Sequence, residues 1–491
     1  MQCVILLLVD GLRADMAEGL LAAGELPHLA AMTARRGIGR AVTTFPSTTG
    51  VSYLPFLTGC MPGRLNIPAI RWLDRARYAG RWWLDRRYVR SYCGYQAGML
   101  DDDLPTNMRT IWELIPESAG IFTPVARGLP PSRNPSHRAR QVWGTLAHFI
   151  PPLYRREDRA AEKHLAHEVE CDRRFIFAQF PSVDGFTHTY GPDAPQVRRA
   201  LHGVDEAVGS LRVALARHDA LDDTLIVLVS DHGAALVHTH LDLADWFRDR
   251  GVPALSHPAL WAHDPRVAVA VSGNGHATLY ADPGVPRLTR RSVTELRHPG
   301  AFGSRTDLIA ELAAEPGIAF LAGESGRGTL EVVGAEGTAE VDSAGPDVVY
   351  RPLTGDPLLL GGPRAATAAE WVTAAQDDPY PDAAVQLLDQ FRAPRTGDLV
   401  IAAREGWDLR DGWEFPEHRA GHGSLVRSHM LVPLWASQPV PAGPVRSVDV
   451  FPALLNWLGE PIPPGICGEP VWMPGTRRRG TRRPTPVFAE V

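Results

Sequence analysis

Three short apolar runs, far apart in the chain, limit the folds open to it. They read CVILLLVD (residues 3–10), RFIFAQF (174–180) and TLIVLVSD (224–231), and each is followed by polar or turn residues. An amphipathic helical pattern at 197–218 lies between the last two. Continuous apolar runs that alternate with such helices are typical of a parallel sheet buried on both faces. The sequence therefore predicts an α/β fold with a doubly wound, mainly parallel sheet flanked by helices.

The pattern changes after residue 240, where β alternation broken by Gly-rich turns surrounds a helix-like RTDLIAELAAEPG. We interpret 241–394 as an inserted α+β cap that covers the site and selects the leaving group. The catalytic core then consists of a first part at 1–240 and a second part at 395–475, which opens with GDLVIAAREGW. Residues 476–491 are basic and Pro-rich, and they predict a solvated tail.

Composition excludes several classes of function. A formal charge of -6 and a pI near 6.3 argue against bulk nucleic-acid binding. The five cysteines are scattered, without the spacing of a disulfide framework or a zinc ribbon, which favours a reducing compartment. The first apolar run lacks a basic flank and a cleavage site, so it predicts a strand rather than a signal peptide. With no stretch long enough to span a membrane, we expect a cytoplasmic protein.

Acidic and histidine side chains follow all three apolar runs. Asp10 comes directly after the first run, and Asp231 and His232 come directly after the third. After the second run, PSVDGFTHTYGP places Asp184 and His188 four residues apart. Ligands of doubly wound sheets bind outside the carboxyl ends of the strands. A single Asp at a strand end is commonly a helix cap, but this repetition is difficult to explain structurally.

Near the C-terminus, EHRAGHGSL adds His418 and His422 beside glycines. Three carboxylates and at least three imidazoles are therefore expected at one edge of the sheet. Carboxylates gathered without a cation would repel one another, and this donor set suits zinc, manganese or iron. The sequence predicts a site for two divalent metal ions.

The segment TTFPSTTGVSYLPFLTG (43–59) concentrates hydroxyl groups before an apolar run. Such a cluster commonly supplies a helix N-cap and nothing more. The alternative is that one hydroxyl acts as a nucleophile. The residues of this segment alone leave both interpretations open.

Together these motifs resemble the alkaline phosphatase superfamily, in particular its type I phosphodiesterase and nucleotide pyrophosphatase branch. LLLVDGLR, FPSTT with LTG, VDGFTHTYGP, LVSDHG and GHGS occur in the order of that family. The resemblance implies an alkaline phosphatase-like fold with two metal positions. The implied ligands are Asp184, His188 and His422 for one ion, and Asp10, Asp231 and His232 for the other, completed by the oxygen of the nucleophile. His418, one helical turn from His422, is the alternative to it.

The resemblance also selects one hydroxyl. The family places its nucleophile nine residues before the Thr of a Thr-Gly pair, and here Thr58–Gly59 points to Thr49. Thr49 would be both nucleophile and metal ligand, and would open a helix beginning GVSYLPFL, whose N-terminus favours a phosphoryl anion. Thr48 and Ser47 are the neighbouring alternatives.

One segment departs from the family. Where relatives carry His-Gly and then a phosphate-binding Asn, this chain has Leu65–Asn66 and Ile70. Arg71 is the adjacent candidate for substrate contact, since guanidinium groups pair well with phosphate, although a surface arginine would read the same way.

The resemblance implies a metal-dependent hydrolase of phosphodiester or pyrophosphate bonds, with two divalent ions, zinc before manganese or iron, and a small phosphate-ester substrate. A phosphomonoesterase or phosphonate hydrolase on the same scaffold is the alternative. A catalytically silent binding protein ranks last, because all seven metal and nucleophile positions are present. The oligomeric state is left open.

Overall fold

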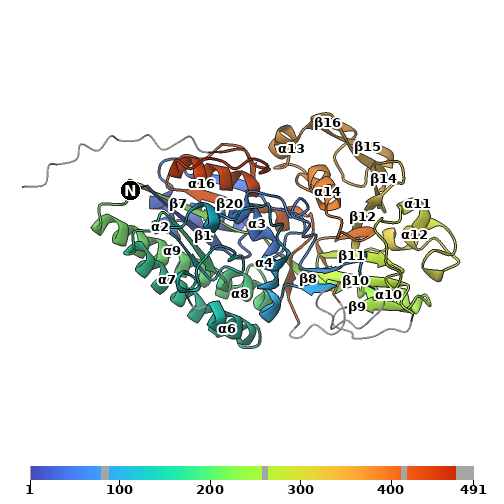
Figure 1. Ribbon diagram of the computed structural model, residues 1–491, viewed down its shortest axis with the longest axis horizontal. Coiled ribbons are helices and arrows are strands. Elements are labelled where there is room, and N and C mark those ends of the chain that lie inside the picture. Colours follow the sequence, from blue (N-terminus) through green and yellow to red (C-terminus); the bar gives the residue numbers. More distant parts are fainter. Residues whose placement is uncertain (1, 79–87, 136, 257–263, 411–416, 472–491) are drawn as a thin grey trace, which may run out of the picture.

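The structure is a computed structural model, and it describes residues 2–78, 88–135, 137–256, 264–410 and 417–471. Two large sheets organise these residues into two lobes, and Figure 1 shows each sheet with its own helices. The basic tail predicted at 476–491 lies outside the described residues.

The first lobe is built on a seven-stranded sheet. In spatial order its strands are β21 (Val445–Arg446), β2 (Ile38–Val42), β20 (Leu431–Ala436), β7 (Thr224–Val229), β1 (Cys3–Val9), β6 (Phe175–Phe180) and β5 (Ser118–Ile121). β1 pairs in parallel with β7 on one side and β6 on the other, so the three apolar runs are neighbouring central strands. β5 continues the parallel set, whereas β20 and β2 extend the opposite edge in antiparallel fashion. The predicted α/β fold is confirmed.

Helices cover both faces of this sheet because every residue of its central strands is apolar or buried. Side chains of a strand alternate between faces, so Val4 and Leu6 of β1 enter one core while Ile5 and Leu7 enter the other. The first core includes α3 (Leu54–Thr58), α5 (Ile111–Leu114) and α16 (Val450–Leu458). The second includes α1 (Ala14–Ala22), α2 (Pro27–Met32), α7 (Tyr154–Val169) and α9 (Pro195–Arg217).

The second lobe is built on a nine-stranded, mostly antiparallel sheet. Its order is β16 (Arg364–Thr367), β15 (Asp347–Gly355), β14 (Gly337–Ala344), β13 (Leu330–Gly334), β12 (Ile318–Glu324), β17 (Leu399–Ala403), β11 (His276–Ala281), β10 (Val267–Ser272) and β9 (Ala254–Ser256). The helix expected within the insertion is α12 (Leu308–Ala313), which packs on this sheet with α10 (Leu243–Asp249). The other face carries α13 (Ala368–Ala374) and α14 (Ala383–Arg392).

One assignment in the predicted second core part is wrong. The run GDLVIAAREGW contributes β17, which lies between β12 and β11 of the second sheet rather than in the first sheet. All five residues of β17 are buried, and an apolar run satisfies a central strand of either sheet equally well. The chain returns to the first sheet only at β20. The division into core and cap at 241–394 otherwise stays a prediction.

Two further findings concern the chain as a whole. None of the helices in the described ranges combines the length and apolarity that a membrane crossing requires. All five cysteines are free thiols. The cytoplasmic location stays a prediction.

Candidate active site

The carboxyl ends of β1, β6 and β7 bring the predicted ligands to one edge of the first sheet. The parallel register sets Val9 opposite Phe180 and Leu8 opposite Val229, so the residues that follow these strands emerge at the same level. Asp10 follows β1, and Asp231 and His232 follow β7. Asp184 and His188 lie on α8 (Ser182–Tyr190), which begins two residues after β6.

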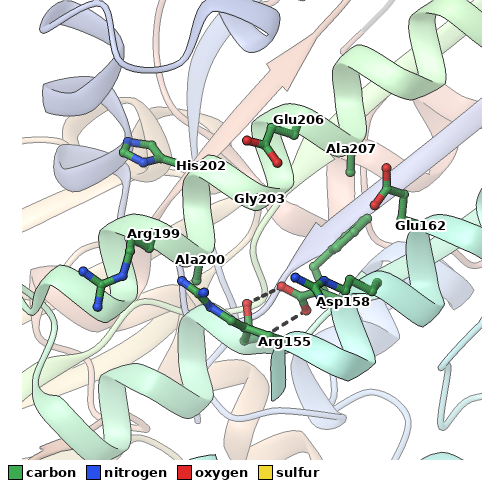
Figure 2. Close-up of a pocket in the computed structure, with 12 residues that line it drawn as sticks. Arg155, Asp158, Glu162, Arg199, Ala200, His202, Gly203, Glu206 and Ala207 are labelled. Carbon is green, nitrogen blue, oxygen red and sulfur yellow. Dashed lines mark hydrogen bonds between the residues drawn. The ribbon is translucent and has the colours of Figure 1, made fainter. Parts of the chain in front are cut away.

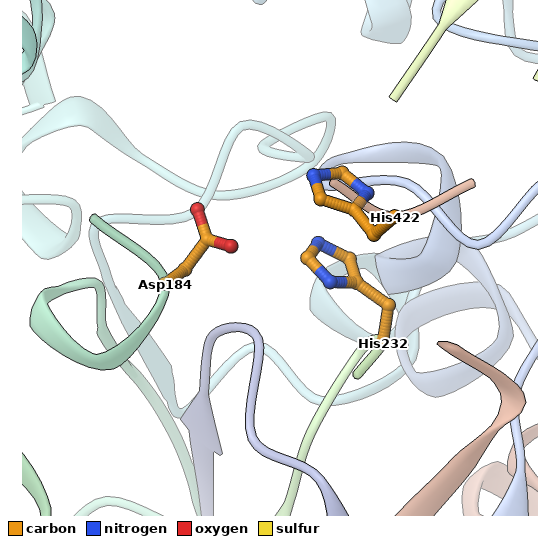
Figure 3. Close-up of side chains that lie close together, drawn as sticks. All are labelled: Asp184, His232 and His422. Atoms are coloured by element: carbon orange, nitrogen blue, oxygen red, sulfur yellow. The ribbon is translucent and has the colours of Figure 1, made fainter. Parts of the chain in front are cut away.

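A fourth segment reaches the same edge from the C-terminal part of the chain. His422 follows β19 (Ala420–Gly421), a short strand paired with β8 (Ala235–His240). Its ring stacks on that of His232, with ring centroids 3.7 Å apart. Figure 3 shows these two rings beside each other, with the Asp184 carboxylate across from them. The structure therefore brings His422 to the same edge of the sheet as His232 and Asp184, and its role as a metal ligand stays a prediction.

The rings of His188, His232 and His422 are each oriented by a contact between Nδ1 and a backbone carbonyl oxygen. Nδ1 of His422 lies 2.8 Å from the carbonyl oxygen of Ser47, Nδ1 of His188 lies 2.8 Å from that of Ala420, and Nδ1 of His232 lies 3.1 Å from that of Gly233. A carbonyl only accepts, so Nδ1 donates in each ring and Nε2 is the nitrogen left to face the site. This backbone anchoring is typical of metal-binding histidines.

Two carboxylates of the site keep a buried oxygen outside the hydrogen-bond network. Oδ2 of Asp231 and Oδ1 of Asp184 are buried without a hydrogen-bond partner. In the described part of the chain, neither residue forms an ion pair with an arginine or lysine. Burial, together with the neighbouring charges of Asp10 and Asp184, raises the pKa of Asp231 well above its ordinary value. Burial and the adjacent His232 and His188 rings lower the pKa of His422 well below its ordinary value. Neutral imidazoles beside orphaned carboxylates fit divalent metal ions.

Two groups of side chains are close enough to hold an ion each. Asp10, Asp231 and His232 form one group, and Asp184, His232 and His422 form the other; within each, the ligand atoms lie within 4.8 Å of one another. The first group matches the predicted set. In the second, His232 takes the place predicted for His188, whose Nε2 lies 3.4 Å from Oδ1 of Asp184.

His418, the alternative to His422, falls outside both groups. Its buried ring packs on His188 with centroids 4.3 Å apart and on His148 with centroids 5.0 Å apart. His418 therefore backs the outer side of His188, while His422 faces the carboxylates. The preference for His422 agrees with this geometry.

Thr49 is the hydroxyl residue that faces the ligands. Its Oγ1 lies 2.9 Å from Nε2 of His232 and 3.3 Å from Oδ1 of Asp10. The neighbouring hydroxyls are turned away, since Ser47 donates to the carbonyl of Ser424 at 3.0 Å and the buried Thr48 lies against the carbonyl of Pro46. Three-dimensional position thus separates Thr49 from its neighbours, and its role as nucleophile stays a prediction.

The segment directly after Thr49 is not the continuous helix that we expected. A 3₁₀ turn, η1 (Val51–Tyr53), precedes the five-residue α3, and Gly50 is its N-cap with φ 84°. Thr49 is therefore not an N-cap, and a short broken helix contributes little dipole. The positive φ at Gly50 turns the chain sharply, which is what directs Thr49 toward the ligands.

A cavity of about 280 Å³ opens above Thr49. Its floor includes Asp10, Thr49 and Asp184, and its walls carry apolar and aromatic side chains from the first lobe: Tyr53, Ile70, Tyr92, Leu100, Pro124 and Tyr154. All the described lining residues lie between 10 and 184, so the predicted cap at 241–394 does not line this cavity. The walls come instead from the segment between β2 and β6.

A loop of the second lobe packs against the residues of the site. Gly273, in the loop between β10 and β11, has φ 62°, and a Cβ there would lie 2.6 Å from Thr48 and 2.9 Å from Nδ1 of His422. Only glycine fits this close approach. The loop of residues 272–275 packs against His422.

Sequence reasoning missed two residues that hold Asp10. Tyr53 donates its hydroxyl proton to Oδ2 of Asp10 at 3.0 Å, and the side-chain amide of Gln179 donates to the same oxygen. Both are buried. Because these two hydrogen bonds go to Oδ2, the other oxygen of Asp10, Oδ1, is the one that faces Thr49. Gln179 stood out only as a polar residue inside an apolar strand, and that was the signal available.

Arg71 lies at the margin of the cavity. It begins β3 (Arg71–Leu73), its Nη1 donates to the carbonyl of Val271 at 3.2 Å, and its Nη2 lies 4.0 Å from the sulfur of Cys93, which lines the cavity. The substrate contact predicted for Arg71 stays a prediction.

The start of α8 is fixed by a half-buried carboxylate from α7. Asp158 accepts hydrogen bonds from the backbone and the hydroxyl of Ser182, the first residue of α8 (Figure 2). Burial raises the pKa of Asp158 to about 7. Because Asp184 and His188 lie on the same short helix, Asp158 positions both of them.

Comparison with known proteins agrees with these observations. Residues 4–298 match the family described as type I phosphodiesterase / nucleotide pyrophosphatase. An uncharacterized pyrophosphatase/phosphodiesterase of Schizosaccharomyces pombe is 25% identical over 236 residues, 47% of this chain and 44% of that protein. Human ectonucleotide pyrophosphatase/phosphodiesterase family member 7 is 34% identical over 73 residues, 15% of this chain and 16% of that protein. These matches span less than half the length of either relative.

Solved structures resemble nearly the whole chain. Murine ectonucleotide pyrophosphatase/phosphodiesterase 5, an inactive variant in complex with AMP, superposes with a TM-score of 0.55 at 14% identity, over 94% of this chain and 96% of that one. Phosphonoacetate hydrolase from Sinorhizobium meliloti 1021 in complex with phosphonoformate gives 0.53 at 17% identity, over 93% and 96%. At these identities the likeness establishes the alkaline phosphatase-like fold.

Proposed function

The chain belongs to the type I phosphodiesterase / nucleotide pyrophosphatase family, and on that premise we propose that it hydrolyses phosphodiester or pyrophosphate bonds with Thr49 as nucleophile. The observation that carries the proposal is the position of Thr49 Oγ1, 2.9 Å from His232 and 3.3 Å from Asp10 on the floor of an apolar-walled cavity. Relatives whose structures hold AMP or phosphonoformate support a small phosphate- or phosphonate-bearing substrate.

We assign two cation positions to the two ligand groups. Asp10, Asp231 and His232 would hold one ion, and Asp184, His422 and His188 or His232 would hold the other. Mixed carboxylate and imidazole donors suit zinc first, with manganese or iron as alternatives. When bound, such ions favour loss of the Thr49 proton and neutralise charge on the phosphoryl oxygens.

The chain's own residues then supply orientation and the covalent step. Tyr53 and Gln179 fix Asp10, so the carboxylate and the His232 ring hold the Thr49 hydroxyl at one place on the cavity floor. Thr49 Oγ1 forms a bond to phosphorus as the bond to the leaving alcohol or phosphate breaks in line. Water then cleaves the phosphothreonine and releases the second product, which restores the hydroxyl.

Steady-state assays with bis-p-nitrophenyl phosphate and p-nitrophenyl phosphate test the proposal. We expect Thr49→Ala to lower kcat/KM by about 10³-fold or more, because the nucleophile is lost. Thr48→Ala is the matched control, one residue away and turned from the cavity, and should stay within about tenfold of the wild type. Full metal-dependent diesterase activity in Thr49→Ala would refute the assignment. Faster turnover of the monoester would favour a phosphomonoesterase on the same scaffold.

Metal analysis tests the cofactor. We expect two divalent ions per chain in purified protein, and fewer in Asp231→Asn. Protein that binds no divalent metal under saturating conditions would contradict the di-metal site.

A further inference from the structure

Two of the five free cysteines meet where the segment after α16 returns to the end of α3. Cys60 comes two residues after α3, and Cys467 lies in the irregular segment that follows α16. The backbone N–H of Cys467 donates to the carbonyl of Gly59 at 2.8 Å, and Sγ of Cys60 lies 3.7 Å from the carbonyl oxygen of Gly465. These two contacts place the cysteines side by side, although they come from opposite ends of the chain.

The sulfur atoms of this pair interact directly. The Cys60 thiol donates a hydrogen bond to the sulfur of Cys467, which also accepts the backbone N–H of Met61. The contact with Cys60 lowers the pKa of Cys467 to about 6, although burial opposes the shift. The same contact, together with burial, raises the pKa of Cys60 well above its ordinary value. At neutral pH Cys467 is therefore the thiolate and Cys60 the thiol.

Charged side chains around the pair favour the same division. Arg64, in the loop after α3, and Arg392, the last residue of α14, both lower the pKa of Cys467. The buried Asp389 of α14 raises the pKa of Cys60 instead. Buried structural cysteines are inert, whereas reactive thiols lie in electropositive and partly exposed surroundings. Cys467, half-buried between two arginines, belongs to the second kind.

The backbone around Cys467 is held in place on its C-terminal side. A Cβ at Gly468 would lie 2.2 Å from the carbonyl oxygen of Val448, so the two segments are in close contact. The backbone N–H of Glu469 donates to Oδ1 of Asp449 at 2.9 Å. A disulfide forms without strain only where two backbones already lie close together. The contacts on both sides of Cys467 keep its sulfur next to that of Cys60, so little movement is needed to join them.

We propose that Cys467 and Cys60 form a site of reversible thiol–disulfide exchange with small disulfides, in which Cys467 attacks and Cys60 resolves. Cys60 is fully buried, so a reagent from solvent meets the half-buried Cys467 first. The resulting cross-link would tie the end of α3 to the segment after α16. The proposal uses neither Thr49 nor a metal ion, and it is independent of the proposed hydrolase activity.

The exchange proceeds in two balanced steps. The Cys467 thiolate forms a bond to one sulfur of the small disulfide, whose S–S bond breaks and releases the other half as a thiolate. The Cys60 sulfur then bonds to the Cys467 sulfur, the mixed disulfide breaks, and the proton of Cys60 passes to the second leaving thiol. The two cysteines lose two electrons, and these reduce the small disulfide to two thiols.

Peptide mapping of the full chain tests this proposal, with oxidised glutathione as the probe. The protein is reduced, desalted into a buffer with chelator, exposed to the probe, blocked with N-ethylmaleimide and digested without reductant. We expect a peptide pair joined through Cys60 and Cys467 as the main product of the native protein. Dithiothreitol should return both residues to thiols.

Variants separate the attacking thiol from the resolving thiol. Cys60→Ala should hold glutathione on Cys467 as a stable mixed disulfide, because nothing resolves it. Cys467→Ser should leave the buried Cys60 as a thiol. Cys171→Ser is the matched control, since Cys171 is also half-buried, and it should form the cross-link like the wild type. Circular dichroism verifies that every variant is folded.

Thermal unfolding gives a second readout. The cross-linked wild type and Cys171→Ser should show a Tm higher by about 3 °C or more than the reduced proteins, because the bond closes a long loop of the unfolded chain. A native wild type in which Cys60 and Cys467 both stay thiols would overturn the proposal, with glutathionylation of the exposed Cys93 as proof that the probe is active. A stable mixed disulfide on wild-type Cys467, or a cross-link that forms only in urea, would overturn it as well.

Discussion

Two buried acidic sites, one in each lobe, differ in how the protein compensates their charge. In the second lobe, Asp398 accepts hydrogen bonds from Arg75 at 2.8 Å, from Arg287 at 3.0 Å and from the backbone amides of Ala281 and Arg291. At the edge of the first sheet, Asp231 and Asp184 each keep a buried oxygen without a partner. Asp398 is satisfied by the protein itself, and the first-sheet carboxylates are not.

The difference teaches how to separate structural from functional burial of charge. A charge buried with its counter-ion and full hydrogen bonding holds two parts of a fold together, because loss of one partner leaves the other uncompensated. Carboxylates gathered without a counter-ion destabilise the fold unless a ligand supplies positive charge. The Asp398 site joins the β3 region to the second sheet, while the donor set of the first-sheet site fits a divalent cation.

The largest expected difference between the two sites is in activity. Asp231→Asn should lower kcat/KM for bis-p-nitrophenyl phosphate by about 10³-fold, since it weakens a metal position and the alignment of Thr49. Asp398→Asn, assayed below its unfolding temperature, should stay within about tenfold of wild type. Comparable losses in both variants would remove the distinction drawn between the sites.

For the free energy of unfolding, we expect Asp398→Asn to have the larger effect and Asp231→Asn the smaller one. Asp398→Asn should lower the free energy of unfolding by about 3–5 kcal/mol, because Arg75, only 5% exposed, loses its buried partner. Asp231→Asn in metal-free protein should be at least as stable as metal-free wild type, because one of the repelling carboxylates is removed. Urea unfolding of both variants at one pH measures this. A metal-free Asp231→Asn that unfolds more easily would show that Asp231 is satisfied without a cation.

Removal of metal sharpens the comparison further. Adding zinc at 100 times its Kd should stabilise chelator-treated wild type by about 2.7 kcal/mol for each ion bound. Asp398→Asn should gain the same increment from its lower baseline, while Asp231→Asn should gain less. Thermal unfolding with and without zinc provides the readout, and an equal gain in all three proteins would place the metal elsewhere.

The smallest effect concerns His276 of β11, a buried group of the second lobe that has no hydrogen-bond partner on either ring nitrogen. Burial lowers its pKa from 6.5 to about 3. Between these values the unfolded chain binds more protons than the folded one, so the folded state loses stability as pH falls below 6.5. The loss from this residue is about 1.4 kcal/mol per pH unit.

His276→Phe should remove that part of the acid sensitivity. Denaturant unfolding at pH 6.5 and pH 5.5 should show a fall smaller by about 1 kcal/mol in the variant than in wild type. The aromatic replacement keeps the edge contact with Phe45, whose ring centroid lies 5.0 Å from that of His276. An unchanged pH dependence would mean that the ring finds a partner in solution.

The sequence patterns predicted the strands of the first lobe better than those of the second. The runs that become β1, β6 and β7 are apolar over their full length, so burial on both faces could be inferred from each one separately. The ligands after them followed from the rule that strand ends share one edge. β17 shows the limit, because its five buried residues satisfy a central strand in either sheet and nothing local selects the partner strands.

The site divides in the same way. The sequence by itself determined the candidates for the chemistry: Asp10, Asp184, Asp231 and the histidines come from motifs near the ends of apolar runs and near the C-terminus, and the spacing of the resembled family marks Thr49. Only the tertiary structure decided that Tyr53 and Gln179 hold Asp10, that Gly273 admits the His422 ring, and that the first lobe, not the predicted cap, walls the cavity. Periodicity reports how a segment meets the core, whereas these contacts join residues up to hundreds of positions apart, and packing alone sets them.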